Sequence, residues 1–97
     1  MPAYLVANIE VTDSAGFERY RAAVPEVIAR FGGRYLIRGG ELHHVEGELP
    51  LKRLVVLEFP GMQAARAFYD SADYAPLLKL RLETTRSEVA LVEGYAG

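Results

Sequence analysis

The stretch Gly32-Gly33-Arg34-Tyr35-Leu36-Ile37-Arg38-Gly39-Gly40 places a short strand-like segment between two pairs of glycines. Helices commonly end on a residue at positive φ, which glycine adopts without a Cβ clash, so the first pair predicts the end of a preceding helix. The second pair lies inside what otherwise reads as one longer strand. Paired glycines there indicate a bulge or the close approach of another backbone or a ligand. The chain is therefore expected to enter this strand sharply and to deform it midway.

Length and composition predict one ordinary globular domain over residues 1–97. About half of the residues are hydrophobic (51%), 25% are charged, and the formal net charge is −2. Interleaved charges of both signs argue against nucleic acid or an anionic membrane as the partner. The chain has no cysteine, which excludes disulfides and thiolate sites. Because we find neither a secretion signal nor an apolar run of ~20 residues, we expect a cytoplasmic protein.

The periodicity of apolar residues predicts the element order strand, helix, strand, strand, helix, strand. The expected strands are Tyr4–Val11, Arg34–Arg38 with a continuation over Glu41–Glu46, Lys52–Phe59 and Ser87–Tyr95. The first helix is expected to run from the capping candidates Thr12-Asp13-Ser14 to Gly32-Gly33, and the second over Met62–Tyr69. A further helical segment is expected from Asp73 through Leu77–Leu82.

This order is typical of the α+β ferredoxin-like βαββαβ fold, in which helices cover one face of a four-stranded antiparallel sheet. The opposite face would carry Tyr4, Val6 and Asn8 or their alternates, with Leu54, Val56, Val89 and Leu91 as further candidates. An exposed apolar face of that extent predicts a partner. The simplest partner is a second copy related by a two-fold axis, so we expect a homodimer with its sheets face to face.

The sequence also resembles a known family. The residues that carry the resemblance are Tyr20, Gly32-Gly33-Arg34-Tyr35-Leu36, Arg38-Gly39-Gly40, Glu46-Gly47, Glu58-Phe59-Pro60, Ala64-Ala65, Phe68-Tyr69, Ser71, Tyr74 and Arg81. Together they are similar to the pattern of the domain of unknown function 1330 family over nearly the whole chain. Ala72 stands where that family more often has proline, and Phe68 where tryptophan is common; both differences bear on packing.

The resemblance implies a fold and leaves the function open. It implies the dimeric α/β-barrel superfamily, whose members include cofactor-independent monooxygenases, muconolactone isomerase-like enzymes and haem-binding chlorite dismutase-like proteins. The family itself has no established general reaction.

Glu58 is the candidate catalytic residue. It lies between Leu57 and Phe59 on an expected strand, where partial desolvation would raise its pKa towards that of a general base. The alternative is that it pairs with an arginine and anchors the corner between strand and helix. Asn8 joins it as a candidate if both side chains face the open side of the sheet.

Arginines and tyrosines supply the other candidate binding groups. Arg34 and Arg38, four residues apart on a strand, are expected to project to one face, about 13 Å apart. They could hold a carboxylate or carbonyl group, or serve as ordinary edge-strand charges or as partners of nearby glutamates. Arg81 is either a ligand anchor or part of a salt bridge between helices. Tyr35, Tyr69 and Tyr74 either line a pocket or pack in the core with their hydroxyls at the surface.

No metal ion and no other cofactor is expected. His43 and His44 are adjacent in an expected strand, so they would point to opposite faces and could not chelate one ion, and the chain has no third histidine. A haem ligand is equally unexpected in this hairpin. The sequence has neither a phosphate-binding glycine loop nor a serine elbow.

Two functions remain open from the sequence. The first is a small homodimeric enzyme that acts without a metal on a small aromatic or oxo-acid metabolite, by proton transfer or cofactor-independent oxygenation. The second is a non-catalytic, small-ligand-binding or stress-related dimer. The pKa and burial of Glu58, and a cavity of roughly 300 Å³ or more beside it, would distinguish the two.

Overall fold

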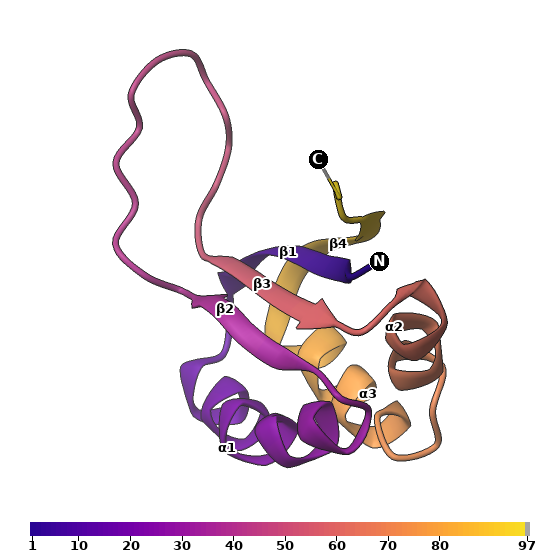
Figure 1. The fold of residues 1–97 in the computed structure, drawn as a ribbon. Coiled ribbons are helices and arrows are strands. Elements are labelled where there is room, and N and C mark those ends of the chain that lie inside the picture. Colours follow the sequence, from indigo (N-terminus) through magenta and orange to yellow (C-terminus); the bar gives the residue numbers. More distant parts are fainter. Residues whose placement is uncertain (97) are drawn as a thin grey trace.

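A computed structural model describes residues 1–96 of the chain. Along the chain the elements are β1 (Ala3–Val11), α1 (Ser14–Arg30), β2 (Arg34–Arg38), β3 (Leu54–Phe59), α2 (Met62–Tyr69), α3 (Ala75–Thr84) and β4 (Thr85–Glu93). The strands form one antiparallel sheet in the order β2-β3-β1-β4. All three helices lie on one face of it (Figure 1). The predicted ferredoxin-like fold is confirmed, and the segment after Asp73 is helical as expected.

Helix α1 ends at the first glycine pair, as predicted. The N–H groups of Gly32 and Gly33 donate to the carbonyl oxygens of Ala29 and Ile28, each at 3.0 Å, and Gly32 has a φ of 79°. This is the Schellman arrangement, which satisfies the last carbonyls of a helix. A Cβ on Gly33 would lie 2.6 Å from the ring of Phe59, so this glycine also lets the chain pass close to the core.

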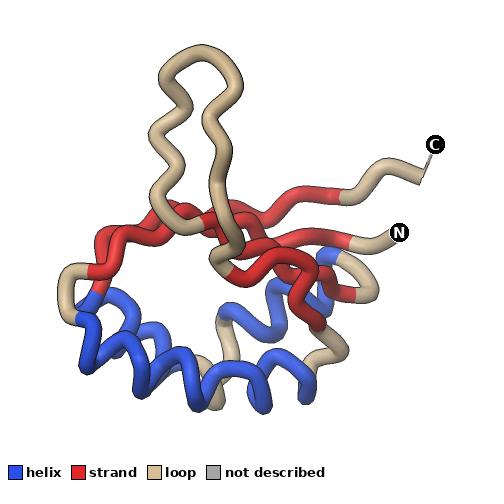
Figure 2. Tube along the Cα trace, turned by 90° about the vertical axis from the view of Figure 1, so that its left-hand side faces the viewer, coloured by secondary structure: helices blue, strands red, loops and turns tan. Residues whose placement is uncertain are grey.

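The prediction is wrong for the segment that follows β2. The expected continuation over Glu41–Glu46 is not a strand, because β2 ends at Arg38 and a loop over residues 39–53 leads to β3. Gly39 has a φ of 68°, a left-handed conformation that turns the chain out of the sheet. The loop then stands on the side of the sheet away from the helices (Figure 2).

The irregularity in the second strand lies at Leu36 and not at the second glycine pair. The register of β2 against β3 shifts between Tyr35 and Ile37, which is a β-bulge. One extra residue reverses the side to which every later side chain points. Arg34 therefore shares a face with Glu58, its partner on β3, whereas Arg38 pairs with Val55 on the opposite face. The prediction that Arg34 and Arg38 project to one face is wrong for this reason.

The core lies between the sheet and the helices. On β1 the buried residues Ala3, Leu5, Ala7 and Ile9 alternate with partly exposed ones. Helix α1 adds an apolar stripe of buried residues at helical spacing, which are Phe17, Val24, Val27 and Ile28. The rings of Phe59 and Phe68 pack with their centroids 5.3 Å apart. In residues 1–96 no helix is both long enough and apolar enough to cross a membrane.

The other face of the sheet, here called the open face, is left uncovered by the helices. Its apolar residues include Tyr4, Val6, Ile37, Leu54, Val56, Ala90 and Val92. Val89 and Leu91, also predicted for this face, lie on the helix side instead. The reason is register: they pair with Ala7 and Leu5, which are buried against the helices.

Candidate functional site

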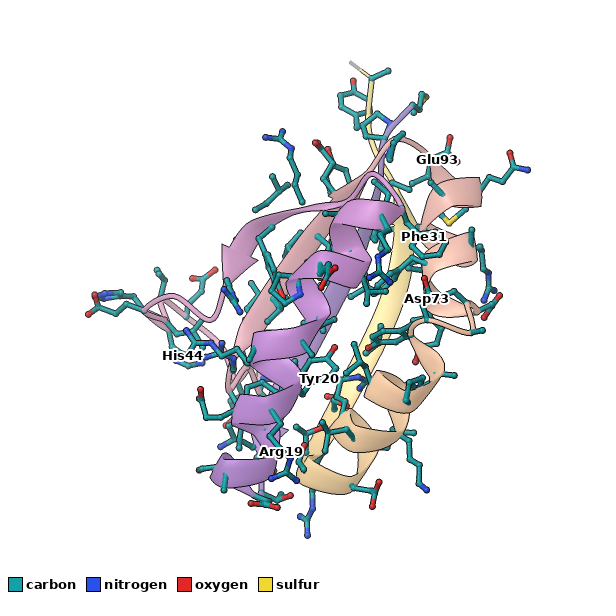
Figure 3. The ribbon with its side chains drawn as sticks, turned by 90° about the horizontal axis from the view of Figure 1, so that it is seen from below. Arg19, Tyr20, Phe31, His44, Asp73 and Glu93 are labelled. Atoms are coloured by element: carbon teal, nitrogen blue, oxygen red, sulfur yellow. The ribbon has the colours of Figure 1, made fainter. Side chains whose placement is uncertain are left out.

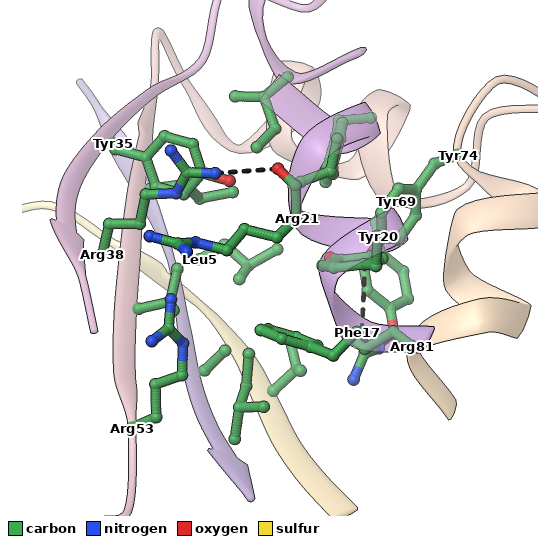
Figure 4. Close-up of a pocket in the computed structure, with 18 residues that line it drawn as sticks. Leu5, Phe17, Tyr20, Arg21, Tyr35, Arg38, Arg53, Tyr69, Tyr74 and Arg81 are labelled. Atoms are coloured by element: carbon green, nitrogen blue, oxygen red, sulfur yellow. Dashed lines mark hydrogen bonds between the residues drawn. The ribbon is translucent and has the colours of Figure 1, made fainter. Parts of the chain in front are cut away.

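A cavity lies between the sheet and the helices (Figure 4). The space in it that the centre of a water-sized molecule can occupy is about 40 Å³, and the whole recess, including the part open to solvent, has a volume of about 510 Å³. Most of the lining is apolar, from β1, β3 and α1. The tyrosines and arginines that line it are Tyr20, Arg21, Tyr35, Arg38, Arg53, Tyr69, Tyr74 and Arg81. We call this space the recess.

Arg81 is a buried cation among hydroxyl groups. Its side chain is only 3% exposed. Nε donates to the hydroxyl of Tyr74 at 3.3 Å, Nη2 to the hydroxyl of Tyr69 at 3.1 Å, and Nη1 to Oγ of Ser87. Among residues 1–96, no carboxylate forms an ion pair with Arg81. The structure therefore shows no salt bridge between helices at this position.

Local sequence explains how these groups come together. Ser71 Oγ donates to the carbonyl of Phe68 at the end of α2 and accepts from the N–H of Tyr74 at 3.0 Å, which fixes the start of α3. Tyr74 and Arg81 are seven residues apart, two helical turns, and so lie on the same side of α3. Tyr69 comes from the end of α2.

Tyr20 completes the hydroxyl cluster from α1. Its hydroxyl lies 2.8 Å from that of Tyr74, and the side chain points from α1 towards α3 (Figure 3). Burial raises the pKa of Tyr20, and burial also raises the pKa of Tyr35. Both side chains are therefore neutral hydroxyls at physiological pH, able to donate a hydrogen bond and unsuited to act as bases.

The electrostatics at Arg81 favour an electron-rich ligand atom. A buried charge normally has a counter-charge, because removing it from water is costly. Guanidinium has five N–H groups, and three of those of Arg81 are donated to hydroxyl oxygens of the described residues. The remaining donors and the positive charge can stabilise a carbonyl, phenolate or enolate oxygen in the recess.

Arg38 and Tyr35 line the recess from the sheet. The Arg38 guanidinium stacks 4.7 Å from the centre of the Tyr35 ring, and its Nη2 donates to the main-chain carbonyl of Arg21 at 2.9 Å. The bulge at Leu36 makes this arrangement possible, because without it Arg38 would point to the open face. Of the predicted binding residues, the structure thus brings Tyr35, Arg38, Tyr69, Tyr74 and Arg81 together.

Sequence reasoning does not identify three of the lining residues. Tyr20 is named in the sequence analysis only among the residues that carry the family resemblance. Arg21 is four residues after Phe17, so helical spacing alone could have placed it beside that buried ring. Arg53 is two residues before Val55 and four before Leu57, so the two-residue period of a strand could have placed it on the same, helix-facing side.

Glu58 and Arg34 lie on the open face, away from the recess. Glu58 Oε1 accepts from Arg34 Nε at 2.8 Å, and its Oε2 accepts from the Tyr4 hydroxyl at 3.2 Å. The hydrogen bond from Arg34 holds the pKa of Glu58 below its ordinary value, although partial burial opposes this. The expectation of a raised pKa is wrong, and the alternative of an arginine pair at this corner is confirmed.

Asn8 is also on the open face, where it holds the base of the loop. Its Nδ2 donates to the carbonyl of Pro50 at 2.9 Å, and its Oδ1 accepts from the N–H of Lys52 at 2.8 Å. These two contacts give the Asn8 side chain a structural role at the junction of β1 and the loop.

Both histidines are exposed and lie on the loop over residues 39–53; Figure 3 labels His44 there. His43 Nε2 is 3.1 Å from Glu41 Oε1, and both side chains are largely exposed. In residues 1–96, no three histidine, aspartate or glutamate side chains gather closely enough to hold a metal ion.

Solved structures share this fold at low sequence identity. A protein of unknown function from Rhodopseudomonas palustris, RPA0582, has a TM-score of 0.76 and 14% identity, covering 99% of this chain and 84% of that one. SnoaB, a cofactor-independent oxygenase from Streptomyces nogalater, has a TM-score of 0.63 and 18% identity, covering 99% of this chain and 95% of that one. A dimeric ferredoxin-like protein of unknown function from Jannaschia sp. CCS1 has a TM-score of 0.66 and 13% identity, covering 97% of this chain and 100% of that one.

Comparison with curated proteins gives no match. The sequence itself matches the family described as domain of unknown function (DUF1330) over residues 2–95, which is nearly its full length. The chain therefore belongs to the DUF1330 family.

Proposed function

We propose that this protein binds a small aromatic or oxo-acid metabolite in the recess, with Arg81 and the hydroxyls of Tyr69 and Tyr74 holding an oxygen atom of the ligand. One observation carries the proposal: Arg81 is 3% exposed, lines the cavity, and contacts hydroxyls without a counter-charge in the described residues. Ligand anchorage is the alternative for Arg81 that fits these contacts.

The dimensions of the recess limit the ligand. Pockets for drug-sized ligands have volumes of roughly 300–1,000 Å³, whereas the space here that the centre of a water-sized molecule can occupy is about 40 Å³. This size favours a ligand with a single ring or a short oxo-acid chain. Its body would lie against apolar lining side chains such as Phe17 and Val55.

We further propose that two copies pair through their open faces. Val6, Val56 and their apolar neighbours lie on the open face without a helix to cover them, and the loop over residues 39–53 borders the same side (Figure 2). A second sheet would remove this surface from water. Sedimentation should give a dimer for the wild type, and Val6→Lys, which places a charge at the centre of the open face, should give a folded monomer. A wild type that stays monomeric at micromolar concentration contradicts this pairing.

Catalysis is the second candidate, favoured by the same cation. A buried guanidinium with fixed hydroxyls can stabilise an oxyanion as it forms, which is a major source of catalytic acceleration. SnoaB, which has the same fold, is a cofactor-independent oxygenase. Among the described residues, the lining holds no carboxylate and no histidine, so the substrate would have to arrive as its own anion. Glu58, on the open face with a lowered pKa, is not the base in this alternative.

Thermal-shift and NMR titrations with a panel of simple phenols and 2-oxo acids test the binding proposal. Ligands that bind the folded state raise its melting temperature by mass action. We expect hits on the wild type that are lost in Arg81→Met, which keeps an unbranched side chain and removes the charge. Lys79→Met, an exposed position on the same helix, is the matched control and should keep them. The proposal fails if the wild type binds no member of the panel at millimolar concentration.

Two further assays separate binding from turnover. Each hit is incubated in deuterated water to detect exchange at carbon, and in a closed cell to detect oxygen uptake. Activity in the wild type that is absent from Arg81→Met supports an enzyme. Hits without exchange or oxygen uptake support the non-catalytic binding protein.

A further inference from the structure

Three arginines converge on the recess from three different elements. Arg21 comes from α1, Arg38 ends β2, and Arg53 lies just before β3; all three line the cavity, and Figure 4 shows them one above the other along the side nearest the sheet. Arg21 and Arg38 are exposed and Arg53 is half-buried, in contrast to the buried Arg81. The three guanidiniums therefore form the outer rim of the recess, and we call them the rim arginines.

The rim arginines lack the acidic partners that normally accompany such a cluster. Among residues 1–96, Arg38 and Arg53 form no ion pair, and Arg21 has only Glu18 at 3.7 Å, on the exposed side of its helix. Arg38 is satisfied in part by a main-chain carbonyl and a tyrosine ring. The charges of Arg21 and Arg38 repel that of Arg53, and an anion bound among the three would offset this repulsion.

Arg53 is the clearest sign that a ligand atom belongs here. Its Nε is buried and has no hydrogen-bond partner in the described part of the chain. The guanidinium lies 5.5 Å from the centre of the Phe17 ring. The pKa of Arg53 is lowered, chiefly by burial and then by the positive charges of Arg21 and Arg38. Buried donors without partners are rare in folded proteins. A bound anion would supply both the missing acceptor and the missing negative charge.

Gly39 lies directly against the Arg53 guanidinium. A Cβ at position 39 would overlap the guanidinium where it lies, so a side chain there would displace this end of Arg53. The N–H of Gly39 donates to the carbonyl of Leu54 at 2.8 Å, which closes the long loop and brings its two ends together. The sequence indicated a bulge or the close approach of another backbone or a ligand at the Gly39-Gly40 pair; the group that lies against Gly39 is instead the side chain of Arg53.

We propose that the rim arginines bind a carboxylate, so that the ligand of the recess is an acid with its carboxylate at the rim and its apolar body directed inwards. Planar guanidinium forks match the two oxygens of a carboxylate, and the apolar lining beyond them matches a ring or short hydrocarbon body. This inference rests on the proposed function for the body of the ligand, and on the rim arginines alone for its charge.

The test uses phenylacetate, its uncharged isostere phenylacetamide, and acetate, which is the head group without a ring. Titrations of the wild-type protein are followed by NMR at constant ionic strength. Charge-assisted hydrogen bonds are stronger than neutral ones, so phenylacetate should bind about tenfold or more tightly than phenylacetamide. Arg53→Gln should weaken phenylacetate binding by about tenfold and leave phenylacetamide unchanged. Arg19→Gln removes the same charge from an exposed position on α1 and should alter neither.

The outcomes separate this inference from the proposed function. Equal affinity for phenylacetate and phenylacetamide, or equal weakening by Arg53→Gln and Arg19→Gln, overturns the carboxylate site while leaving a binding recess. Acetate binding that needs Arg53, with no gain from the ring of phenylacetate, supports the carboxylate site and removes the recess as a ligand pocket. If none of the three probes binds the folded wild type, the carboxylate site is overturned as well.

Discussion

The two faces of the sheet treat charged side chains in opposite ways. On the open face, Glu58 accepts from both Arg34 and Tyr4, so cation, carboxylate and hydroxyl satisfy one another. On the helix face, Arg81 and Arg53 are cations without carboxylates in the described residues, one of them nearly fully buried. A paired charge is complete as it stands, whereas an unpaired one retains attraction for a ligand. The difference fits the proposals that a ligand binds on the helix face and that two copies pair through the open face.

One inserted residue produces this division. Arg34 and Arg38 belong to the same strand, yet the bulge at Leu36 sends the first to the Glu58 pair and the second to the recess. Both arginines look alike in the sequence. Their difference in role is a consequence of strand register.

The largest expected effect compares one substitution on the two faces. Leu57→Ala removes a side chain that is 4% exposed in the core and should lower the free energy of unfolding by about 2–4 kcal/mol. Leu54→Ala, on the open face, should cost less than about 1.5 kcal/mol in the monomer. Urea denaturation measures both. Because the open face is the proposed dimer interface, only the loss caused by Leu54→Ala, relative to the wild type at the same concentration, should depend on protein concentration. A concentration-dependent loss for Leu57→Ala would contradict the proposed difference between the two faces.

The next effect compares the two glycines at the start of the loop. Gly39→Ala places a Cβ against the Arg53 guanidinium at a φ of 68°, so we expect a loss of about 2 kcal/mol. A Cβ on Gly40 would meet no other atom within 4 Å, and Gly40→Ala should be neutral or slightly stabilising. Equal melting temperatures for the two variants would show that the rim arginines are not held by Gly39.

A smaller effect is expected for the buried hydroxyl of Tyr74. Tyr74→Phe removes the group that accepts from Arg81 Nε and contacts the Tyr20 hydroxyl, which should cost about 1 kcal/mol of stability. Tyr95→Phe, at a side chain that is 93% exposed, is the control and should cost nothing measurable. Matching denaturation curves for the two variants would show that the Tyr74 hydroxyl does not stabilise the fold.

The smallest effect concerns Glu58 and pH. Its pKa is lowered in the folded state, chiefly by the hydrogen bond from Arg34, so the ionised form stabilises the fold. That contribution is fully present above the pKa of an unperturbed glutamate, about 4.3, and is lost as the pH falls through the lower folded value. Glu58→Gln should therefore be slightly less stable than the wild type at pH 7, and the gap should close towards pH 3. A gap that widens on acidification would mean that the pKa is raised.

Most of the fold could be predicted from sequence because local rules decide it. Alternation on β1, the apolar stripe of α1 and the Gly32-Gly33 terminus each depend on neighbours in the chain. The prediction of a strand over Glu41–Glu46 is wrong because this segment has no neighbouring strand to pair with. The predicted face of Val89 is wrong because it depends on the register of β4 against β1. The candidate binding residues that line one common space in the structure are Tyr35, Arg38, Tyr69, Tyr74 and Arg81.

The rest of the site depends on distant contacts. The fate of Glu58 depends on an arginine in another strand, and that of Arg53 on a glycine at the far end of the loop. Neither relation leaves a local pattern in the sequence.

The central claim is that the ligand binds on the helix face through unpaired arginines, and one titration tests it most directly. Arg34→Gln and Arg38→Gln change the same residue type four positions apart on opposite faces of the sheet. Phenylacetate affinity, measured by NMR on both variants and the wild type, should fall about tenfold in Arg38→Gln and stay at the wild-type value in Arg34→Gln. An equal loss in the two variants, or a loss only in Arg34→Gln, would place the ligand elsewhere and contradict the account.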